Sequence, residues 1–138
     1  MLASRIDNIT LSGTIEINAK TIEMSENGIE VINLCPGEPD LPTPENIKIA
    51  AKKAIDQNKT KYTANHGIKE LRKTICTKFF NNYGAQYSPE EVIVTNGAKQ
   101  AIYSVLQAII NEGDEVILPS PYYVSYTHMI RLAGGDPV

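Results

Sequence analysis

The sequence has 138 residues, of which 42% are hydrophobic and 21% are charged, which is enough for one modest globular domain. Acidic residues outnumber basic ones by 16 to 13, and the net charge of −3 argues against a nucleic-acid-binding protein. The chain has two cysteines without a CxxC spacing, which argues against a disulfide framework. No stretch has the character of a signal peptide or a membrane span. A cytoplasmic protein is therefore expected.

An arm and a helix are predicted at the N-terminus. Residues 1–14 have the character of an extended arm. Thr14 is expected to cap a helix over residues 15–26, and Gly28 is expected to end it. The candidate buried residues of this helix are Ile15, Ile17 and Ile22.

A short strand and a rigid loop are predicted next. Residues 31–34 have the composition of a strand. Residues 35–44 contain four prolines and a glycine, which exclude both a helix and a central strand. The prolines restrict the backbone of this loop, and no side chain at Gly37 blocks access to its amide. The loop can therefore form the wall of a pocket. A stiff connection explains the same residues equally well.

Two further helices are predicted from their end signals. Thr43 is expected to cap the first of them, with Pro44 at the first helical position and Glu45 in the first turn. One face of this helix carries Ile47, Ala50, Ala51, Ala54 and Ile55. The second helix is expected over residues 68–83, with Gly84 at its end. Its apolar stripe consists of Leu71, Ile75, Phe79 and Phe80.

The loop between these helices, residues 60–67, contains two side chains that can act on a ligand. Tyr62 can donate its hydroxyl to an anionic group, and His66 can titrate near neutral pH. A solvated loop is the simpler explanation, especially for His66. No grouping of histidine, cysteine and aspartate in the sequence has the spacing of a metal site.

A strand that turns directly into a helix is the main local motif. Residues 92–95 are a β-branched run, and Asn-Gly-Ala then leads into helical apolar spacing up to about residue 110. The first amides of a helix have no partner within it, and the helix dipole makes that end positive. Gly97 lets a bound group approach closely and Lys99 adds a positive charge, so a phosphate site is possible. An ordinary connection is the commoner explanation, since neither GxxxxGK[ST] nor GxGxxG is present.

The last part of the chain repeats the alternation of strand and helix. A turn at residues 111–114 leads to a strand over 115–118, a Pro-Ser-Pro sequence breaks it, and a helix over 122–132 follows. Residues 136–138 look like the start of another strand. This alternation predicts an α/β fold with a mostly parallel sheet flanked by helices. Because only two of its strands are clear, the fold is expected to be incomplete and to open a larger protein.

Tyr123 follows the second clear strand. Ligands gather at the carboxyl ends of strands in open parallel sheets, and an aromatic side chain there can stack on a flat heteroaromatic ring. A surface tyrosine pair is the alternative for this residue alone. Together with the phosphate site at Gly97, however, Tyr123 suits a phosphorylated planar cofactor.

Five segments occur in a familiar order and spacing: SGTIEINAK, LCPGEPDLPTP, KYTANHGIKELR, VIVTNGAKQAIY and GDEVILPSPYYVSY. In these segments the chain resembles the N-terminal part of the class I and II pyridoxal-phosphate-dependent aminotransferases, with the bacterial aspartate aminotransferases as the most similar branch. The resemblance implies the opening portion of fold type I of the PLP-dependent transferases. Residues 1–44 would form the arm, first helix and substrate loop of the small domain, and residues 45–138 would begin the large PLP-binding domain.

The same resemblance implies pyridoxal 5′-phosphate as the cofactor and assigns residues to it. Gly97, Ala98 and Lys99 match the segment whose backbone holds the cofactor phosphate. Tyr123 matches the aromatic residue that stacks on the pyridine ring, where relatives often carry tryptophan. Tyr62 matches the tyrosine that reaches the cofactor phosphate of the partner subunit, which implies a homodimer with shared active sites.

Substrate-binding residues are implied in the same way. Gly37 matches the glycine beside the substrate α-carboxylate, and the resemblance assigns Tyr123 to substrate binding as well. Ser12, Thr14 and Lys99 lie where some relatives recognise the side-chain carboxylate of acidic substrates. The implied partners are amino-acid and 2-oxo-acid substrates.

The lysine that forms a Schiff base with the cofactor lies downstream of residue 138 in the family, so no catalytic residue is assigned. The expected function is the N-terminal segment of a transaminase that transfers the amino group of an amino acid, L-aspartate first, to a 2-oxo acid such as 2-oxoglutarate. The 138 residues alone are expected to be inactive. Aromatic amino acids or prephenate as substrates stay open, as does a catalytically inactive fragment or binding module that retains the start of the fold.

Overall fold

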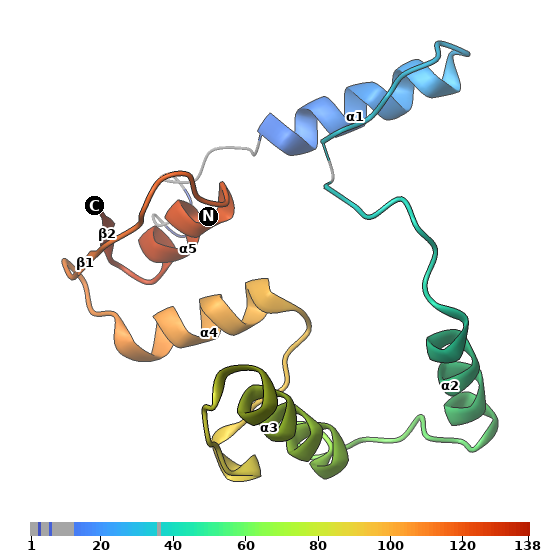
Figure 1. Ribbon diagram of the computed structural model, residues 1–138. Coiled ribbons are helices and arrows are strands. Elements are labelled where there is room, and N and C mark those ends of the chain that lie inside the picture. The colour runs from blue at the N-terminus through green and yellow to red at the C-terminus, as the bar shows by residue number, and fades with distance from the viewer. Residues whose placement is uncertain (1–2, 4–5, 7–12, 36) are drawn as a thin grey trace. The chain divides into compact units, whose positions relative to one another are not determined.

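Figure 1 shows the computed structural model of the protein, which describes residues 3, 6, 13–35 and 37–138. Most of the arm predicted over residues 1–14, including Ser12, lies outside the described residues. None of the helices in the described part of the chain is long and apolar enough to span a bilayer.

The chain folds into two compact units. The first unit combines residues 1–40 with Ile102–Val138, and the second unit is Leu41–Ala101. Helix α4, Ala98–Ile109, begins in the second unit and ends in the first. The expected boundary near residue 44 concerns the small and large domains of the complete protein and stays a prediction.

Helix α1, Gly13–Glu26, confirms the helix predicted near the N-terminus. The cap assigned to Thr14 was wrong, because Thr14 lies inside the first turn and an N-cap residue lies outside the helix. The predicted burial of Ile15, Ile17 and Ile22 was also wrong, since all three are exposed. One contact of α1 with the segment that follows it is polar: Asn33 Nδ2 donates to Asn18 Oδ1 at 2.8 Å.

The strand predicted over residues 31–34 does not form. Ile32 and Leu34 are each 86% exposed, and no ladder bonds join this segment to a strand in the described residues. An extended run becomes a strand only when a second strand bonds to it, so composition alone was insufficient here. The described residues of the loop 35–44 contain neither helix nor strand, as predicted.

The last part of the first unit forms a parallel two-stranded sheet with a crossover helix, which confirms the predicted α/β pattern. Strand β1, Glu115–Val116, pairs with β2, Asp136–Pro137, and α5, Ser125–Leu132, connects them (Figure 1). The ladder includes Asp136 N–H to the Asp114 carbonyl at 2.8 Å. β1 is shorter than the predicted strand over 115–118, although Leu118 N–H still donates to the Val138 carbonyl at 2.8 Å.

Helix α5 begins three residues later than predicted. Tyr122 and Tyr123 stay in the loop that the Pro-Ser-Pro sequence begins, and Tyr126 N–H makes the first turn bond, to the Tyr123 carbonyl at 2.9 Å. The buried core of the first unit lies between α4 and α5. It consists of Leu106, Met129 and Ile130, surrounded by Ile102, Ile110, Val116, Leu118, Tyr126 and Ala133.

The second unit contains α2, Glu45–Asp56, and α3, Lys69–Tyr83. Both helices were predicted, but the cap assigned to Thr43 was wrong. Pro44 is the N-cap residue, and its carbonyl accepts the backbone N–H groups of Ile47 and Lys48 at 3.0 and 3.2 Å. A proline carbonyl can begin the helix in this way without any side-chain cap.

The strand predicted over residues 92–95 does not form either. Its residues are extended, and Val94 N–H donates to the His66 carbonyl at 3.0 Å without forming a ladder. The turn before it is a short 3₁₀-helix, η2, Pro89–Glu91. Helix α4 begins at Ala98 directly after the run, as the sequence predicts.

Candidate functional site

The predicted phosphate-binding turn consists of a left-handed glycine followed by a helix start. Gly97 has φ +85°, and a Cβ at this position would meet no heavy atom within 4 Å. Thr95 Oγ1 donates to the Gly97 carbonyl at 3.0 Å, and the Ala101 N–H donates to the same oxygen at 3.3 Å. Two bonds to one carbonyl fix the orientation of the peptide that leads into α4.

The helix start at this turn has the electrostatics of an anion site. The bond from the Ala101 N–H to the Gly97 carbonyl is the first i→i−4 bond of α4. The backbone N–H groups of the residues just before Ala101 therefore lie in the first turn of the helix, at the positive end of its dipole. Gln100 Oε1 accepts a hydrogen bond from the Asn96 N–H at 2.7 Å. This bond ties the residue before Gly97 to the first turn of α4. Ala98 and Lys99 are the first two residues of the helix, and both are exposed.

Tyr62 belongs to the same second unit. It lies in the loop after α2, and its side chain is fully exposed. The loop ends in a tight turn in which Gly67 N–H donates to the Ala64 carbonyl at 2.9 Å. A tyrosine that its own unit leaves uncovered can present its hydroxyl to a group outside that unit.

The remaining predicted residues lie in the first unit. Gly37 has φ +61° and lines an open hollow of about 330 Å³ with Asn33, Leu34, Glu38, Pro39 and Asp40. Thr14 is exposed in the first turn of α1. Tyr123 is 61% exposed, and its ring centroid lies 6.0 Å from that of Tyr126. The structure therefore places Gly97, Ala98 and Lys99 in one turn, while Ser12 lies outside the described residues.

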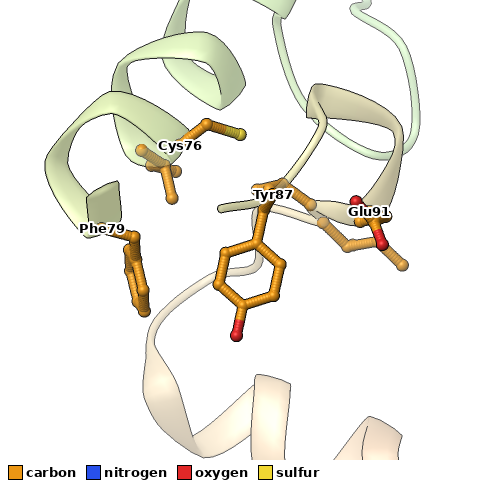
Figure 2. Close-up of a pocket in the computed structure, with 7 residues that line it drawn as sticks. Cys76, Phe79, Tyr87 and Glu91 are labelled. Carbon is orange, nitrogen blue, oxygen red and sulfur yellow. The ribbon is translucent and has the colours of Figure 1, made fainter. Parts of the chain in front are cut away.

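A separate cavity of about 300 Å³ lies within the second unit. Figure 2 shows Tyr87 between Phe79 and Glu91 at this cavity. The Phe79 and Tyr87 rings meet edge to face, with centroids 5.9 Å apart. The lining is mostly apolar and includes no residue predicted to bind cofactor: Ile75, Cys76, Phe79, Tyr87, Glu91, Val92 and Ile93. In the described part of the chain, no three histidine, cysteine or acidic side chains are grouped to hold a metal ion.

Glu91 at this cavity closes the turn before residues 92–95. The Ser88 backbone N–H donates to Glu91 Oε2 at 2.8 Å, and this bond, followed by the Ser88 hydroxyl, lowers the pKa of Glu91. Since the pKa is lower in the folded state, the bond stabilises the turn above the ordinary glutamate pKa. That stabilisation is lost as the pH falls through the folded-state pKa.

We expect Ser88→Ala to raise the pKa of Glu91, because the substitution removes the hydroxyl contribution and leaves the backbone bond. Ser88→Thr keeps a hydroxyl and serves as the control. A carboxyl ¹³C NMR titration of Glu91 measures the difference. An identical titration curve for the alanine and threonine variants would contradict a role for the hydroxyl.

Comparison with known proteins gives the class of this chain. The family model of aminotransferase class I and II matches residues 29–138. The chain therefore belongs to the class I and II aminotransferases, which confirms the resemblance seen in its five sequence segments. Proteins of this family depend on pyridoxal phosphate as a rule.

Three individual proteins show how similar the chain is to known aminotransferases. The chain is 50% identical over 137 residues to an aspartate/prephenate aminotransferase of Cereibacter sphaeroides, covering 99% of this chain and 34% of that protein. It is 48% identical to an aspartate aminotransferase of a Bacillus species, covering 100% and 35%. The solved aspartate aminotransferase of Thermus thermophilus with maleate superposes with a TM-score of 0.95 at 46% identity, covering 100% and 36%.

These similarities confirm the predicted fold class. The chain corresponds to the N-terminal part of the family and spans about a third of the length of the relatives it matches. The short sheet between β1 and β2 is then the described portion of a larger α/β fold.

Proposed function

We propose that the complete protein is a pyridoxal-phosphate-dependent aminotransferase acting on L-aspartate and a 2-oxo acid. The observation that carries this proposal is the turn at Gly97, where a left-handed glycine with open space at its Cβ position precedes a helix start, an arrangement that suits an anion. The turn lies inside the segment matched to the family. The names of the relatives, which include aspartate aminotransferases, support the substrate.

The turn fits the phosphate group of the cofactor. A Cβ at Gly97 meets open space, so a phosphate oxygen can approach the backbone there, and the amides of Ala98 and its neighbours can donate to it. The Lys99 ammonium would add positive charge beside the phosphate oxygens. Tyr123 would lie against the ring and orient it. When bound, the cofactor supplies an electron sink for the amino-acid α-carbon.

The substrate-binding role assigned to Gly37 and Thr14 is part of the same proposal. The Gly37 amide would contact the α-carboxylate of the substrate, and Thr14 and Lys99 would contact the side-chain carboxylate. Five relatives are named as aspartate/prephenate aminotransferases, three of them as probable ones, and this favours prephenate as a second substrate. The enzyme would act in the cytoplasm.

The proposal also includes a homodimer with shared active sites. Tyr62 is fully exposed on its own unit, so its hydroxyl can reach the cofactor phosphate of the partner subunit. Two subunits would then complete each phosphate site. The division into a small domain up to residue 44 and a large domain from residue 45 belongs to the same proposal.

Spectroscopy and turnover of the full-length protein test this proposal. Pyridoxal phosphate should produce a visible absorbance band that borohydride abolishes, and aspartate with 2-oxoglutarate should be converted. Prephenate and phenylalanine in the same panel distinguish the second substrate. The 138-residue chain should give no turnover, because the lysine that the cofactor modifies lies downstream in the family. Absence of both the band and turnover in the full-length protein would leave a non-catalytic binding module as the explanation.

A further inference from the structure

Arg72 is a buried charge in a unit that buries little else. It is 6% exposed and is the buried residue of α3, whose apolar neighbours Leu71 and Phe79 are exposed. No carboxylate forms an ion pair with it among the residues that the structure describes. Burying an unpaired guanidinium is costly, so the hydrogen bonds it makes must offset that cost.

Both hydrogen bonds of the Arg72 side chain go to backbone carbonyls outside α3. Arg72 Nε donates to the Gly67 carbonyl at 3.2 Å, and an Nη atom donates to the Pro89 carbonyl. Gly67 ends the loop that carries Tyr62, and Pro89 begins the 3₁₀ turn ahead of residues 92–95. One side chain therefore bridges two segments that lie far apart in the sequence.

A second contact joins the same two segments directly. Val94 N–H donates to the His66 carbonyl at 3.0 Å. A Cβ on Gly67 would lie 2.8 Å from both Val94 Cβ and Val94 Cγ2, so only glycine fits against the Val94 side chain here. Val94 precedes Gly97 by three residues, so this junction is anchored close to the candidate phosphate turn.

We propose that Arg72 is a positioning residue for the cofactor phosphate, because its side chain fixes the loop of Tyr62 relative to the segment that ends in Gly97. The inference rests on the proposed function. In a dimer, Gly97 would serve the phosphate of its own subunit and Tyr62 that of the partner subunit. Arg72 then couples the two phosphate sites through a single junction within each subunit.

The geometry of the guanidinium explains why arginine is needed. Its planar fork presents several N–H groups in fixed directions, so it can reach two carbonyls at once. A lysine ammonium is a single point of charge on a flexible stem and cannot hold both carbonyls in this geometry. Glutamine keeps an N–H donor without charge and can reach only one of them.

Binding of two cofactor forms to the full-length apoprotein tests this role. Pyridoxal 5′-phosphate and pyridoxal differ in the phosphate alone, so loss of phosphate positioning weakens binding of the first and spares the second. For Arg72→Lys we expect the Kd for pyridoxal 5′-phosphate to rise about tenfold, and the Kd for pyridoxal to stay within about twofold. Arg72→Gln, which buries no new charge, should show the same pattern. Lys73→Gln, at the exposed neighbouring position, is the matched control and should change neither Kd.

The outcomes separate this inference from the proposed function. A rise confined to the phosphorylated form in either Arg72 variant supports the positioning role. Equal rises for both forms indicate a general structural role and overturn it, as does unchanged binding of both. If the unaltered protein fails to bind pyridoxal 5′-phosphate, the proposed function fails first, and the inference falls with it.

Discussion

Gly97→Ala is expected to weaken binding of pyridoxal 5′-phosphate to the full-length protein by about tenfold, or roughly 1.4 kcal/mol. Gly97 has φ +85°, where a side chain is disfavoured by about 1–2 kcal/mol. Alanine should shift the free protein away from this conformation, so binding must restore it. Fluorescence titration of the apoprotein with the cofactor measures the change in Kd.

Two further variants separate backbone strain from steric blocking at this turn. Asparagine tolerates left-handed backbone better than alanine but has a larger side chain. If strain dominates, Gly97→Asn should bind the cofactor more tightly than Gly97→Ala, and if the phosphate needs the space, the order reverses. Gly13→Ala is the control, since its Cβ also meets open space and its φ is not positive. Unchanged affinity in both Gly97 variants would contradict a phosphate site at this turn.

Gly135→Ala is expected to destabilise the first unit by about 2–3 kcal/mol, because the core has no room for the added methyl group. Its Cβ would lie 2.9 Å from Ile110 Cγ2, 3.0 Å from the Asp114 carbonyl and 3.2 Å from Ile130 Cγ2. The Asp114 carbonyl also accepts the Asp136 N–H of the β1–β2 ladder. Moving it away from the methyl group would therefore strain the sheet as well as the core.

Hydrogen exchange in the full-length protein localises this effect. The amides of Asp136 and Val138 should exchange faster in Gly135→Ala, since both donate ladder bonds. Gly113→Ala provides the matched comparison: its φ is +85° but its Cβ meets no atom within 4 Å, so it reports conformational strain without overlap. If Gly113→Ala destabilises the ladder as much as Gly135→Ala, lack of space is not the cause.

Helices and turns were predictable because their signals are local. Gly84 ends α3 in a left-handed conformation, and the Asn-Gly-Ala sequence marks the start of α4, as the sequence indicates. The runs 31–34 and 92–95 look like strands by composition but have no ladder in the described residues. Strand formation depends on a partner elsewhere in the chain, and no local pattern reports whether that partner is present.

The candidate site was predictable only in part. A glycine at the start of an amphipathic helix marks the turn at Gly97, and the structure gives that glycine the expected backbone. Arg72 was missed, although its position offered a signal. It lies at the i+4 position from Ile68 and beside Leu71, inside the apolar stripe of α3, where a charge is costly without partners. Those partners are carbonyls from two distant segments, which sequence spacing does not bring together.

The exposed aliphatic side chains have a consequence for biosynthesis. Five of them are at least 71% exposed: Ile32, Leu34, Leu41, Ile93 and Ile117. The relatives are about three times as long as this chain, so a ribosome making a protein of that length would add the remaining residues for roughly tens of seconds. A nascent polypeptide with this structure would hold these side chains in water during that interval. Chaperones that bind aliphatic segments at the ribosomal exit would find them there, before downstream residues can cover them.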